Sequence, residues 1–356
     1  MNAGFFPRSD PEAVDPEAET GPKAQAQIKE LLRLADEPWV YIDEMQAHGA
    51  VMAGCERFMD RLLAFYRAWG DATVAVDLPP KQVFRQAGVR GDFRVMPCVL
   101  GDDGLKIVKV IGTNEEERQV RDKICVGKSL LVDPYDNHVY AVLDVCALSS
   151  FRTAAVSVLA LRLCGAGGDP VGLVGMGRIG FYTACILHRW LGVDRILAAD
   201  PDPRRRADFS ALCAHYLPAL AVEMLPLAAV TAASNALFLA TTSEEPLVGA
   251  DNGAHLGFVA SVGADADNLS EVDATLLGSH RVVADSRDSM RLGDMRRWAD
   301  AGLLKPGAVA ELRDLAAAGP PTAPQWLFIS TGIAVQDALV NRFVYEACAA
   351  PRGERA

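Results

Sequence analysis

The chain has 356 residues, half of them hydrophobic, and a formal net charge of −11 from 35 basic and 46 acidic side chains. A chain of this length and apolar content can bury more than one core, which predicts two domains. The acidic balance argues against nucleic acid and anionic membrane as main partners, but it leaves open a small anionic ligand bound in a local field.

The N-terminal residues 1–36 are rich in Pro and Glu and lack a long apolar core. They predict a disordered or loosely packed tail rather than a signal peptide or membrane span, and no run of about 18 apolar residues follows. The eight cysteines are scattered without a C-x-x-C pair, as expected for reduced cytoplasmic thiols. The six histidines are dispersed, so no metal site is expected.

Residues 37–150 predict an α+β domain. The stretch 50–70 has apolar residues at helical spacing, and short strand-like pieces follow it, separated by Gly, Asp and Asn turns. Strands in succession without intervening helices indicate a mostly antiparallel sheet. The C-terminal stretch TGIAVQDALVNRFVYEACAA is again an amphipathic helix. We expect it to return to this domain, which then comprises 37–150 and 321–356.

Residues 151–320 alternate strands with helices, which predicts a doubly wound, Rossmann-type parallel sheet. Its first strand runs into the turn GMGRIG, a complete G-x-G-x-x-G with Gly175, Gly177 and Gly180. The three glycines permit a tight turn, close approach of a pyrophosphate, and close packing of helix on strand. Arg178 and Ile179 lie between them at the start of the helix, so we expect both to border a dinucleotide.

Asp200 ends the next strand, 20 residues after Gly180. A carboxylate there accepts hydrogen bonds from the adenosine ribose and repels a 2′-phosphate, which favours NAD over NADP. Three arginines follow at 204–206; they can either hold a 2′-phosphate or be solvated in a helix that Asp202 caps. Thr241 and Thr242 end a later strand, where they either line the cofactor cleft or cap a turn.

Arg152 lies inside the otherwise small or apolar stretch ALSSFRTAAVSVLAL. An unpaired guanidinium costs free energy when it loses water. Arg152 must therefore meet an anion, which is an internal acid such as Asp144, a phosphate or a substrate.

These pieces resemble the ornithine cyclodeaminase/mu-crystallin family from about residue 40 to residue 349. FRTAA, about twenty residues before the glycine-rich turn, is the most specific, and RVMP, VKVIGTN and TGIAVQD occur in the family's order. The resemblance implies an NAD-binding Rossmann domain, a substrate domain through which a homodimer forms, and a small amino-acid substrate. VFRQ, VKVIGT and LSSFRTAAVSVLAL look most like the siderophore-pathway dehydrogenases that cleave N-(1-amino-1-carboxyl-2-ethyl)glutamate into 2,3-diaminopropionate and 2-oxoglutarate.

The resemblance also assigns arginines to the substrate carboxylate. Arg85 in VFRQ matches the family's arginine upstream of the Met-Pro pair, with Arg90 and Arg94 as nearby rivals. Arg152 is the arginine of R-T-A-A. The planar guanidinium of arginine binds a carboxylate bidentately, so this residue type suits the role.

A lysine and an aspartate complete the implied site. Lys109 fits the strand lysine that binds the carboxylate and polarises the reacting centre, although Lys106 can be aligned instead. Asp265 in VGADAD matches the catalytic aspartate after a late Rossmann strand, in preference to Asp267. The residues alone leave plainer interpretations open, namely a solvated strand lysine and an aspartate that caps the next helix.

The implied reaction is NAD-dependent oxidation of a secondary amine flanked by carboxylates. Water then adds to the imine, with Asp265 handling protons, and an amine and a 2-oxo acid are released. Run backwards, the same site is an imine or ketimine reductase. Ornithine or lysine cyclodeamination is an alternative, but cyclodeaminases carry Gly-Gly-Asp-Cys-Pro-Gly-Lys where this chain has GADADNLSE. A non-catalytic ligand binder is a third, and the joint presence of the four substrate-side residues argues against it.

Overall fold

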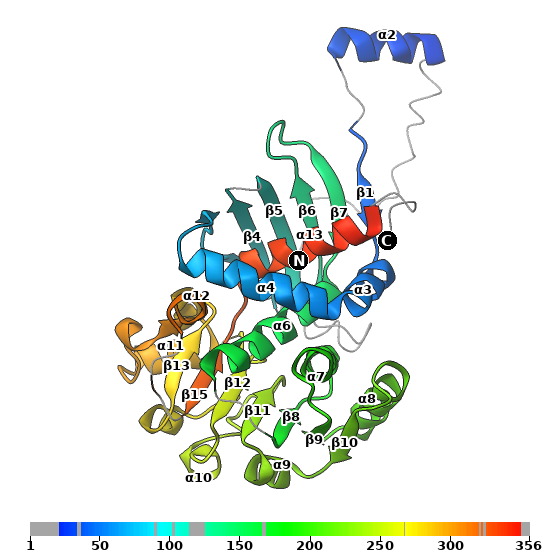
Figure 1. Ribbon diagram of the computed structural model, residues 1–356. Helices are drawn as coiled ribbons and strands as arrows, with labels where there is room; N and C mark the ends of the chain where they lie inside the picture. Colours follow the sequence, from blue (N-terminus) through cyan, green and yellow to red (C-terminus); the bar gives the residue numbers. More distant parts are fainter. Residues whose placement is uncertain are drawn as a thin grey trace. The chain divides into compact units, whose positions relative to one another are not determined.

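The computed structural model describes residues 21–33, 37–88, 91–101, 104–113, 125–165, 169–266, 268–319, 322 and 325–349 (Figure 1). The chain divides into two compact units, Met1–Pro38 and Trp39–Ala356. The described part of the first unit contains helix α2 (Pro22–Leu32), which begins with a proline in its first turn and ends at Arg33 in the left-handed conformation. This helix falls within the segment expected to be a loosely packed tail.

The first sheet has the strand order β1-β7-β6-β5-β4-β2, with β3 also paired to β4. All its ladders are antiparallel except β1 with β7, which confirms the expected antiparallel character. Its strands are β1 (Val40–Ile42), β2 (Val76–Asp77), β3 (Gln82–Phe84), β4 (Asp92–Leu100), β5 (Leu105–Thr113), β6 (Cys125–Val132) and β7 (Val139–Asp144).

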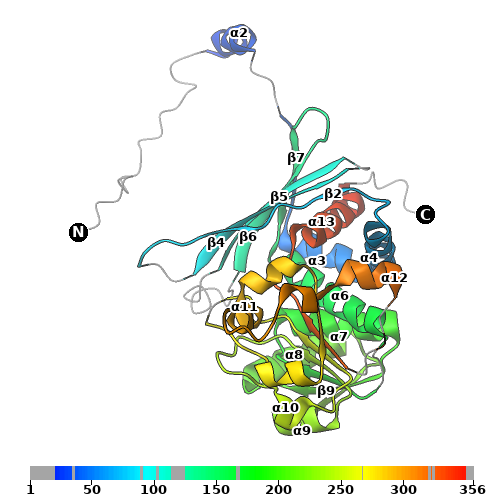
Figure 2. The ribbon, with the colours of Figure 1, turned by 90° about the vertical axis from the view of Figure 1, so that its left-hand side faces the viewer.

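Helices cover one face of this sheet. They are α3 (Glu44–Ala53), α4 (Cys55–Gly70) and α13 (Ala334–Ala349), and Figure 2 shows α3 and α13 on the same side of the strands. Helix α4 buries Phe58, Met59 and Leu62, which have the helical spacing predicted from the sequence. Along β5 the side chains of Leu105, Ile107, Lys109 and Ile111 are buried in alternation, so every second residue faces the helices.

The second sheet is fully parallel, with the order β10-β9-β8-β11-β12-β15-β13-β14. Its strands are β8 (Val171–Val174), β9 (Arg195–Ala199), β10 (Ala221–Met224), β11 (Ala236–Leu239), β12 (Phe258–Ser261), β13 (Arg281–Ala284), β14 (Ala310–Glu311) and β15 (Trp326–Ile329). The central strands are buried at every position, as expected for a sheet with both faces covered. The Rossmann-type domain is therefore confirmed.

Helices and short 3₁₀ turns cover the second sheet. They are α7 (Arg178–Leu191), α8 (Pro203–Tyr216), α9 (Leu227–Ala233), α10 (Ala250–Gly253), η1 (Ala274–Gly278), η2 (Arg287–Arg291), α11 (Gly293–Asp300), η3 (Pro306–Ala308) and α12 (Leu312–Ala318). Strand β15 lies between β12 and β13 in this sheet, beyond the boundary expected near residue 320. Its four apolar residues are fully buried, so the return to the first sheet begins only with α13.

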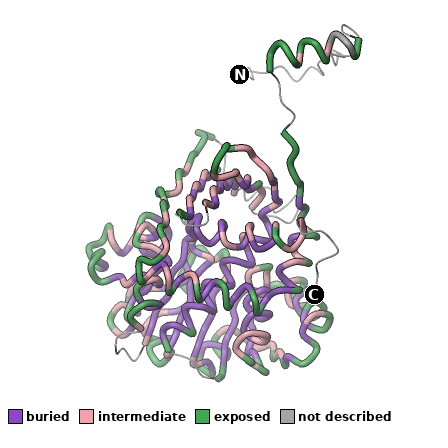
Figure 3. Tube along the Cα trace, turned by 45° about the horizontal axis from the view of Figure 1, so that its top comes forward, coloured by how far each residue is buried: buried purple, intermediate pink, exposed green. Residues whose placement is uncertain are grey.

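Helix α6 (Cys146–Cys164) joins the two sheets in sequence and packs against elements of both. All its residues except Ser149 and Arg162 are buried, and a helix buried on every side belongs in a core. It is the one helix in the described residues that is long and apolar enough to cross a membrane, and here it lies inside the fold. Buried segments form the interior of this unit, with exposed chain around them (Figure 3).

Candidate active site

The glycine-rich turn connects β8 to α7. Gly175 has a φ of 96°, and a Cβ there would lie 2.3 Å from the carbonyl oxygen of Ala240. A Cβ on Gly180 would lie 2.1 Å from the carbonyl oxygen of Gly175, so both positions require glycine. Gly177 precedes α7, no side chain caps the helix there, and a Cβ would meet nothing within 4 Å. The first amide groups of α7 are thus accessible to an anion.

Asp200 follows β9 and faces this turn. Its Oδ2 accepts a 2.8 Å hydrogen bond from the Met176 backbone, and its Oδ1 accepts one of 2.9 Å from the backbone of Asp202. Asp202 caps α8, as expected, by accepting a hydrogen bond from the Arg204 backbone. Arg206 donates to the main-chain oxygens of Asp200 and Pro201 at 2.6 and 3.0 Å. The Asp200 carboxylate is therefore bonded to the glycine turn, and the Arg206 guanidinium is bonded to the end of β9.

A carboxylate that the sequence analysis did not single out, Glu271, holds the cleft-lining Thr241 and Gly263 in place. Glu271 is fully buried. Its Oε1 accepts hydrogen bonds from the backbone and hydroxyl of Thr241, and its Oε2 accepts from Ser261 and from the backbone of Gly263. Burial raises the pKa of the Glu271 carboxyl against these bonds. Glu271 thereby ties the ends of β11 and β12 together. Its partner Gly263 lies two residues before Asp265.

One cleft of about 1760 Å³ runs from the glycine turn to the helix α6. Most of the residues that the sequence analysis assigned line it: Arg85, Arg152, Gly175, Gly177, Arg178, Ile179, Asp200, Thr241, Thr242 and Asp265. Pockets of about 300–1000 Å³ are usual for small ligands, so the cleft has room for a dinucleotide and a second molecule. In the described residues no cluster of metal-ligating side chains is found.

Arg152 reaches the cleft from α6 with loose polar contacts. Its Nη1 donates to Gln336 and its Nη2 to Ser149, both at 3.3 Å, and its Nε lies 3.4 Å from the Asp337 carboxylate. The internal acid is thus Asp337 and not Asp144, which pairs with Lys128. A Cβ on Gly332 would come within 2.5 Å of Nη1. Gly332 also has a φ of 79°, in the left-handed region that favours glycine.

The two strand lysines do not line the cleft. Lys109 is fully buried on the helix-facing side of β5, where its ammonium lies 2.7 Å from Asp337 and 3.0 Å from the Ser149 hydroxyl. Lys106 projects from the other face and donates to Pro134 and Asn137. Strand alternation places the two lysines on opposite faces of β5, and Lys109 reaches the cleft only through Ser149, which lines it. A substrate-binding role for either lysine stays a prediction.

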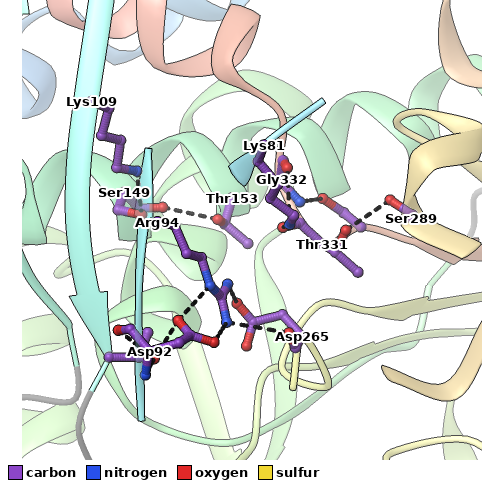
Figure 4. Close-up of polar contacts among 12 residues, drawn as sticks. Lys81, Asp92, Arg94, Lys109, Ser149, Thr153, Asp265, Ser289, Thr331 and Gly332 are labelled. Atoms are coloured by element: carbon purple, nitrogen blue, oxygen red, sulfur yellow. Dashed lines mark hydrogen bonds and ion pairs between the residues drawn. The ribbon is translucent and has the colours of Figure 1, made fainter. Parts of the chain in front are cut away.

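Asp265 meets Arg94 instead of capping a helix. Arg94, buried on β4, donates to Asp92 at 2.8 Å through Nε and to Asp265 at 2.7 Å through Nη1 (Figure 4). Burial by itself raises the pKa of the Asp265 carboxyl, but the charges of Arg94 and Lys81 hold it below its ordinary value. Asp265 is therefore ionised at neutral pH. The rivals Arg90 and Asp267 lie outside the described residues.

Lys81 is a further cation that the sequence analysis did not identify. Its ammonium donates to the carbonyl oxygens of Thr331 and Gly332 at 2.5 and 3.4 Å (Figure 4). Burial, with repulsion by Arg94, lowers the pKa of Lys81 to about 8, although nearby carboxylates oppose the shift. Two cations, Lys81 and Arg94, thus stand close to one cleft-facing carboxylate.

A family model for ornithine cyclodeaminase/mu-crystallin proteins matches residues 46–351. The chain belongs to this family. It is 24% identical over 283 residues to alanine dehydrogenase of Archaeoglobus fulgidus, covering 76% of this chain and 84% of that protein. It is 27% identical over 303 residues to L-lysine cyclodeaminase of Streptomyces rapamycinicus, covering 80% and 85%.

Two further similarities concern the expected branch and the fold. Over 120 residues the chain is 29% identical to N-((2S)-2-amino-2-carboxyethyl)-L-glutamate dehydrogenase of Staphylococcus aureus, a match that covers 33% of this chain and 34% of that protein. An archaeal alanine dehydrogenase dimer with bound NAD superposes with a TM-score of 0.77 at 20% identity, covering 87% of this chain and 96% of that one. The family and its fold are shown. These three relatives are named for three different reactions, so family membership alone does not specify the reaction of this chain.

Proposed function

We propose that the protein is an NAD-dependent oxidoreductase that acts at the amine-bearing carbon of an amino acid or an N-(carboxyalkyl)amino acid. In the preferred form it cleaves the substrate to an amine and a 2-oxo acid, as 2,3-diaminopropionate formation requires. One observation carries the proposal: Arg152, Arg94 and Asp265 border the same cleft as the glycine-rich turn. A substrate acid group and a nicotinamide would then meet in one place.

The residues of the Rossmann half suit NAD. The open amides of α7 at Gly177 would take the pyrophosphate, and the Asp200 carboxylate would accept hydrogen bonds from the adenosine ribose. The charge of Asp200 disfavours a 2′-phosphate, and Arg206 is already bonded to main-chain oxygens. When bound, the cofactor supplies the hydride acceptor.

The first domain would hold the substrate. Arg152 has no hydrogen bond shorter than 3.3 Å among its described contacts, so its guanidinium is able to turn to a carboxylate. Lys81 and Arg85 add positive charge at the same end of the cleft. Lys109 would act as a positioning residue, because it holds Asp337 and Asp337 in turn lies beside the Nε of Arg152.

Asp265 would act through its negative charge. Loss of hydride from an amine-bearing carbon leaves positive charge on the substrate nitrogen, and a fixed carboxylate stabilises that charge. Because Arg94 and Lys81 keep Asp265 ionised, it can also accept a hydrogen bond from the water that attacks the imine. A carboxyl with a lowered pKa is a weak proton acceptor. The main role of Asp265 would therefore be to stabilise positive charge on the substrate, and proton transfer would be secondary.

Cyclodeamination of lysine or ornithine is the second candidate, favoured by the relative from Streptomyces rapamycinicus. One assay separates the two. The holoenzyme is incubated with NAD⁺ or NADP⁺ and L-alanine, L-lysine, L-ornithine or N-(1-amino-1-carboxyl-2-ethyl)glutamate, and absorbance and product masses are followed. Net NADH with 2-oxo acid release supports the proposal. A cyclic imino acid formed with ammonia but without net NADH overturns it in favour of cyclodeamination.

We also propose a homodimer formed through the uncovered face of the first sheet, the face opposite α3, α4 and α13 that no helix of the described residues covers. On that face Val95, Pro97, Val108, Val110 and Leu130 are neighbours in register across three strands. Val110 is 40% exposed and the other four are half-buried; a contiguous apolar patch that reaches the surface indicates an interaction surface. The archaeal alanine dehydrogenase with a similar fold is a dimer, which supports the assignment.

A further inference from the structure

Asp285 follows β13 and is a carboxylate to which the proposed function gives no role. The residue is 1% exposed, and burial of a carboxylate is costly unless polar groups replace the lost water. Its Oδ1 accepts hydrogen bonds from the backbone of Ser286 at 2.9 Å and from the hydroxyl of Ser289 at 2.7 Å. These two contacts are local, so they fix the carboxylate to the end of its own strand.

The other oxygen of Asp285 reaches the neighbouring strand. Oδ2 accepts hydrogen bonds from the Ser330 hydroxyl at 2.7 Å, from the Gly332 backbone at 3.0 Å and from the Gln336 side chain at 3.4 Å. Ser330 and Gly332 follow β15, which pairs with β13, and Gln336 lies in the first turn of α13. One buried carboxylate therefore holds the turn 330–332 and the start of α13.

The same turn contacts two cations near the proposed site for a substrate acid group. Lys81 donates to two carbonyl oxygens of the turn, at 2.5 and 3.4 Å (Figure 4). A Cβ on Gly332 would lie 2.5 Å from Nη1 of Arg152, and the Gln336 side chain accepts from that nitrogen at 3.3 Å. The turn thus donates to the buried carboxylate on one side and accepts from a cation on the other.

The charge of Asp285 also acts on Lys81. Burial lowers the pKa of the Lys81 ammonium, the charges of Arg94 and Arg152 lower it further, and the charges of Asp265 and Asp285 raise it. Lys81 also lines a small cavity with four more charged residues, namely Arg85, Asp288, Arg291 and Arg296. Because a nearby carboxylate favours the charged form of a lysine, loss of the Asp285 charge would lower the pKa of Lys81.

We propose that Asp285 is a positioning residue for substrate binding: it fixes the turn 330–332 and the Gln336 amide so that the charges of Lys81 and Arg152 act on one acid group. The inference rests on the proposed function, which assigns Arg152 to that acid group, and it names what orients the two cations. Asp285 is not among the described residues that line the cleft, so it acts only through these neighbours.

Asp285→Asn removes the charge and keeps the size of the side chain. We expect kcat/KM for a carboxylate substrate to decline at a pH at least about half a unit lower than in wild type, because the Lys81 ammonium then loses its proton more easily. A purely structural loss lowers kcat/KM without moving the decline. When Lys81→Arg is also present no decline should appear, since arginine stays protonated. An unmoved decline in Asp285→Asn would overturn the proposal.

Binding of butyrate, an unreactive carboxylate, gives a measurement that does not depend on turnover. Isothermal titration calorimetry on the full-length enzyme saturated with NAD⁺ should show that Asp285→Asn loses butyrate affinity at a lower pH than wild type. Asp294→Asn is the matched control, because Asp294 is also a buried carboxylate of the second domain but accepts hydrogen bonds from Ser270 and the backbone of Glu271. Its butyrate affinity should be lost at the same pH as in wild type.

Ser330→Ala keeps the proposal testable if circular dichroism shows that Asp285→Asn does not fold. This variant removes the 2.7 Å hydrogen bond to Asp285 and keeps the charge. We expect butyrate to bind about fivefold more weakly at pH 7, because the turn is held less firmly. In that case, wild-type butyrate affinity in Ser330→Ala would overturn the positioning role.

The two proposals fail in different ways. If the enzyme reduces NAD⁺ with an amine substrate while the pH dependence of Asp285→Asn equals that of wild type, the positioning role is wrong and the proposed function stands. If no amine is oxidised but Asp285→Asn loses butyrate affinity at a lower pH than wild type, Asp285 positions the cations and the assigned reaction is wrong.

Discussion

Arg94 and Asp265 join the two sheets through a 2.7 Å hydrogen bond between Nη1 and Oδ2. Arg94 belongs to β4 of the first sheet, and Asp265 follows β12 of the second. The Asp265 side chain is 35% exposed, whereas Asp92, the other partner of Arg94, is 7% exposed. Both carboxylates that Arg94 binds border the cleft, and Asp265 is the more exposed of the two.

Asp265→Asn tests the proposed role of that carboxylate. The amide keeps the size of the side chain but removes the charge that would stabilise a cationic imine, so we expect kcat to fall roughly 100-fold. The NAD⁺ dissociation constant, from NADH fluorescence competition, should change little. Asp92→Asn serves as comparison and should lower kcat less, because the Asp92 side chain is far less exposed to the cleft than that of Asp265. Wild-type turnover in Asp265→Asn would remove Asp265 from the mechanism.

The lowered pKa of Lys81 predicts that activity falls at alkaline pH. Its lowered pKa of about 8 means that the ammonium is charged below this pH and neutral above it. We therefore expect kcat/KM for a carboxylate substrate to decline above pH 8, since this parameter reports the free enzyme. Lys81→Arg stays charged and should abolish the decline. Lys106→Arg should keep it, because Lys106 donates to Pro134 and Asn137 and not to the cleft-lining Thr331 and Gly332. If kcat/KM of the Lys81→Arg variant still declines above pH 8, a group other than Lys81 causes the decline.

Asp200→Asn probes the choice of cofactor. Asparagine can still accept a hydrogen bond from the Met176 backbone, so the turn should hold, but the charge that repels a 2′-phosphate is lost. We expect the ratio of kcat/KM for NAD⁺ to that for NADP⁺ to fall by at least about tenfold. Asp202→Asn, which keeps the cap of α8, should leave the ratio unchanged. The same ratio in Asp200→Asn and wild type would show that Asp200 does not discriminate.

The uncovered sheet face predicts a dimer that a buried charge would disrupt. Val108→Asp places a carboxylate among Pro97 and Leu130, its neighbours in register, and desolvating it at an interface is costly. Sedimentation equilibrium should report a dimer for wild type and a monomer for the variant. Leu303→Asp, at an exposed position of the second domain, should remain dimeric. A monomeric wild-type protein at micromolar concentration would contradict the assignment.

The Rossmann half was predictable because its signals are local. GMGRIG follows a short apolar run and opens a helix, and each of its three glycines has a nearby reason for its identity. The strand alternation of Lys106 and Lys109 was also visible in the sequence, but not which face of β5 would be covered. That depends on α13, more than 200 residues later, whose Asp337 neutralises Lys109.

Long-range pairings account for what sequence reasoning missed. Lys81 precedes β3, and Arg94 lies on β4 opposite Val83, so their proximity depends on a hairpin register that no short motif specifies. Glu271 shows the same limit, since its partners Thr241 and Gly263 meet only because β11 and β12 are neighbours. The apolar run of β15 could equally have belonged to a helix of the returning domain.

The buried ion pair of Lys109 and Asp337 predicts a loss of stability when one partner is removed. Burial lowers the pKa of Lys109 even though the Asp337 carboxylate opposes the shift, so the ammonium depends on its partner. Among the described residues, Lys109→Met leaves Asp337 buried with one ion-pair partner, the Nε of Arg152 at 3.4 Å. Removing one member of a buried pair costs about 3–5 kcal/mol. The urea midpoint should fall accordingly, and Lys109→Met combined with Asp337→Leu should recover part of it, because the orphaned charge is gone. If the double variant is less stable than the single one, the pair is not what holds this part of the core together, and Lys109 loses its positioning role toward Arg152.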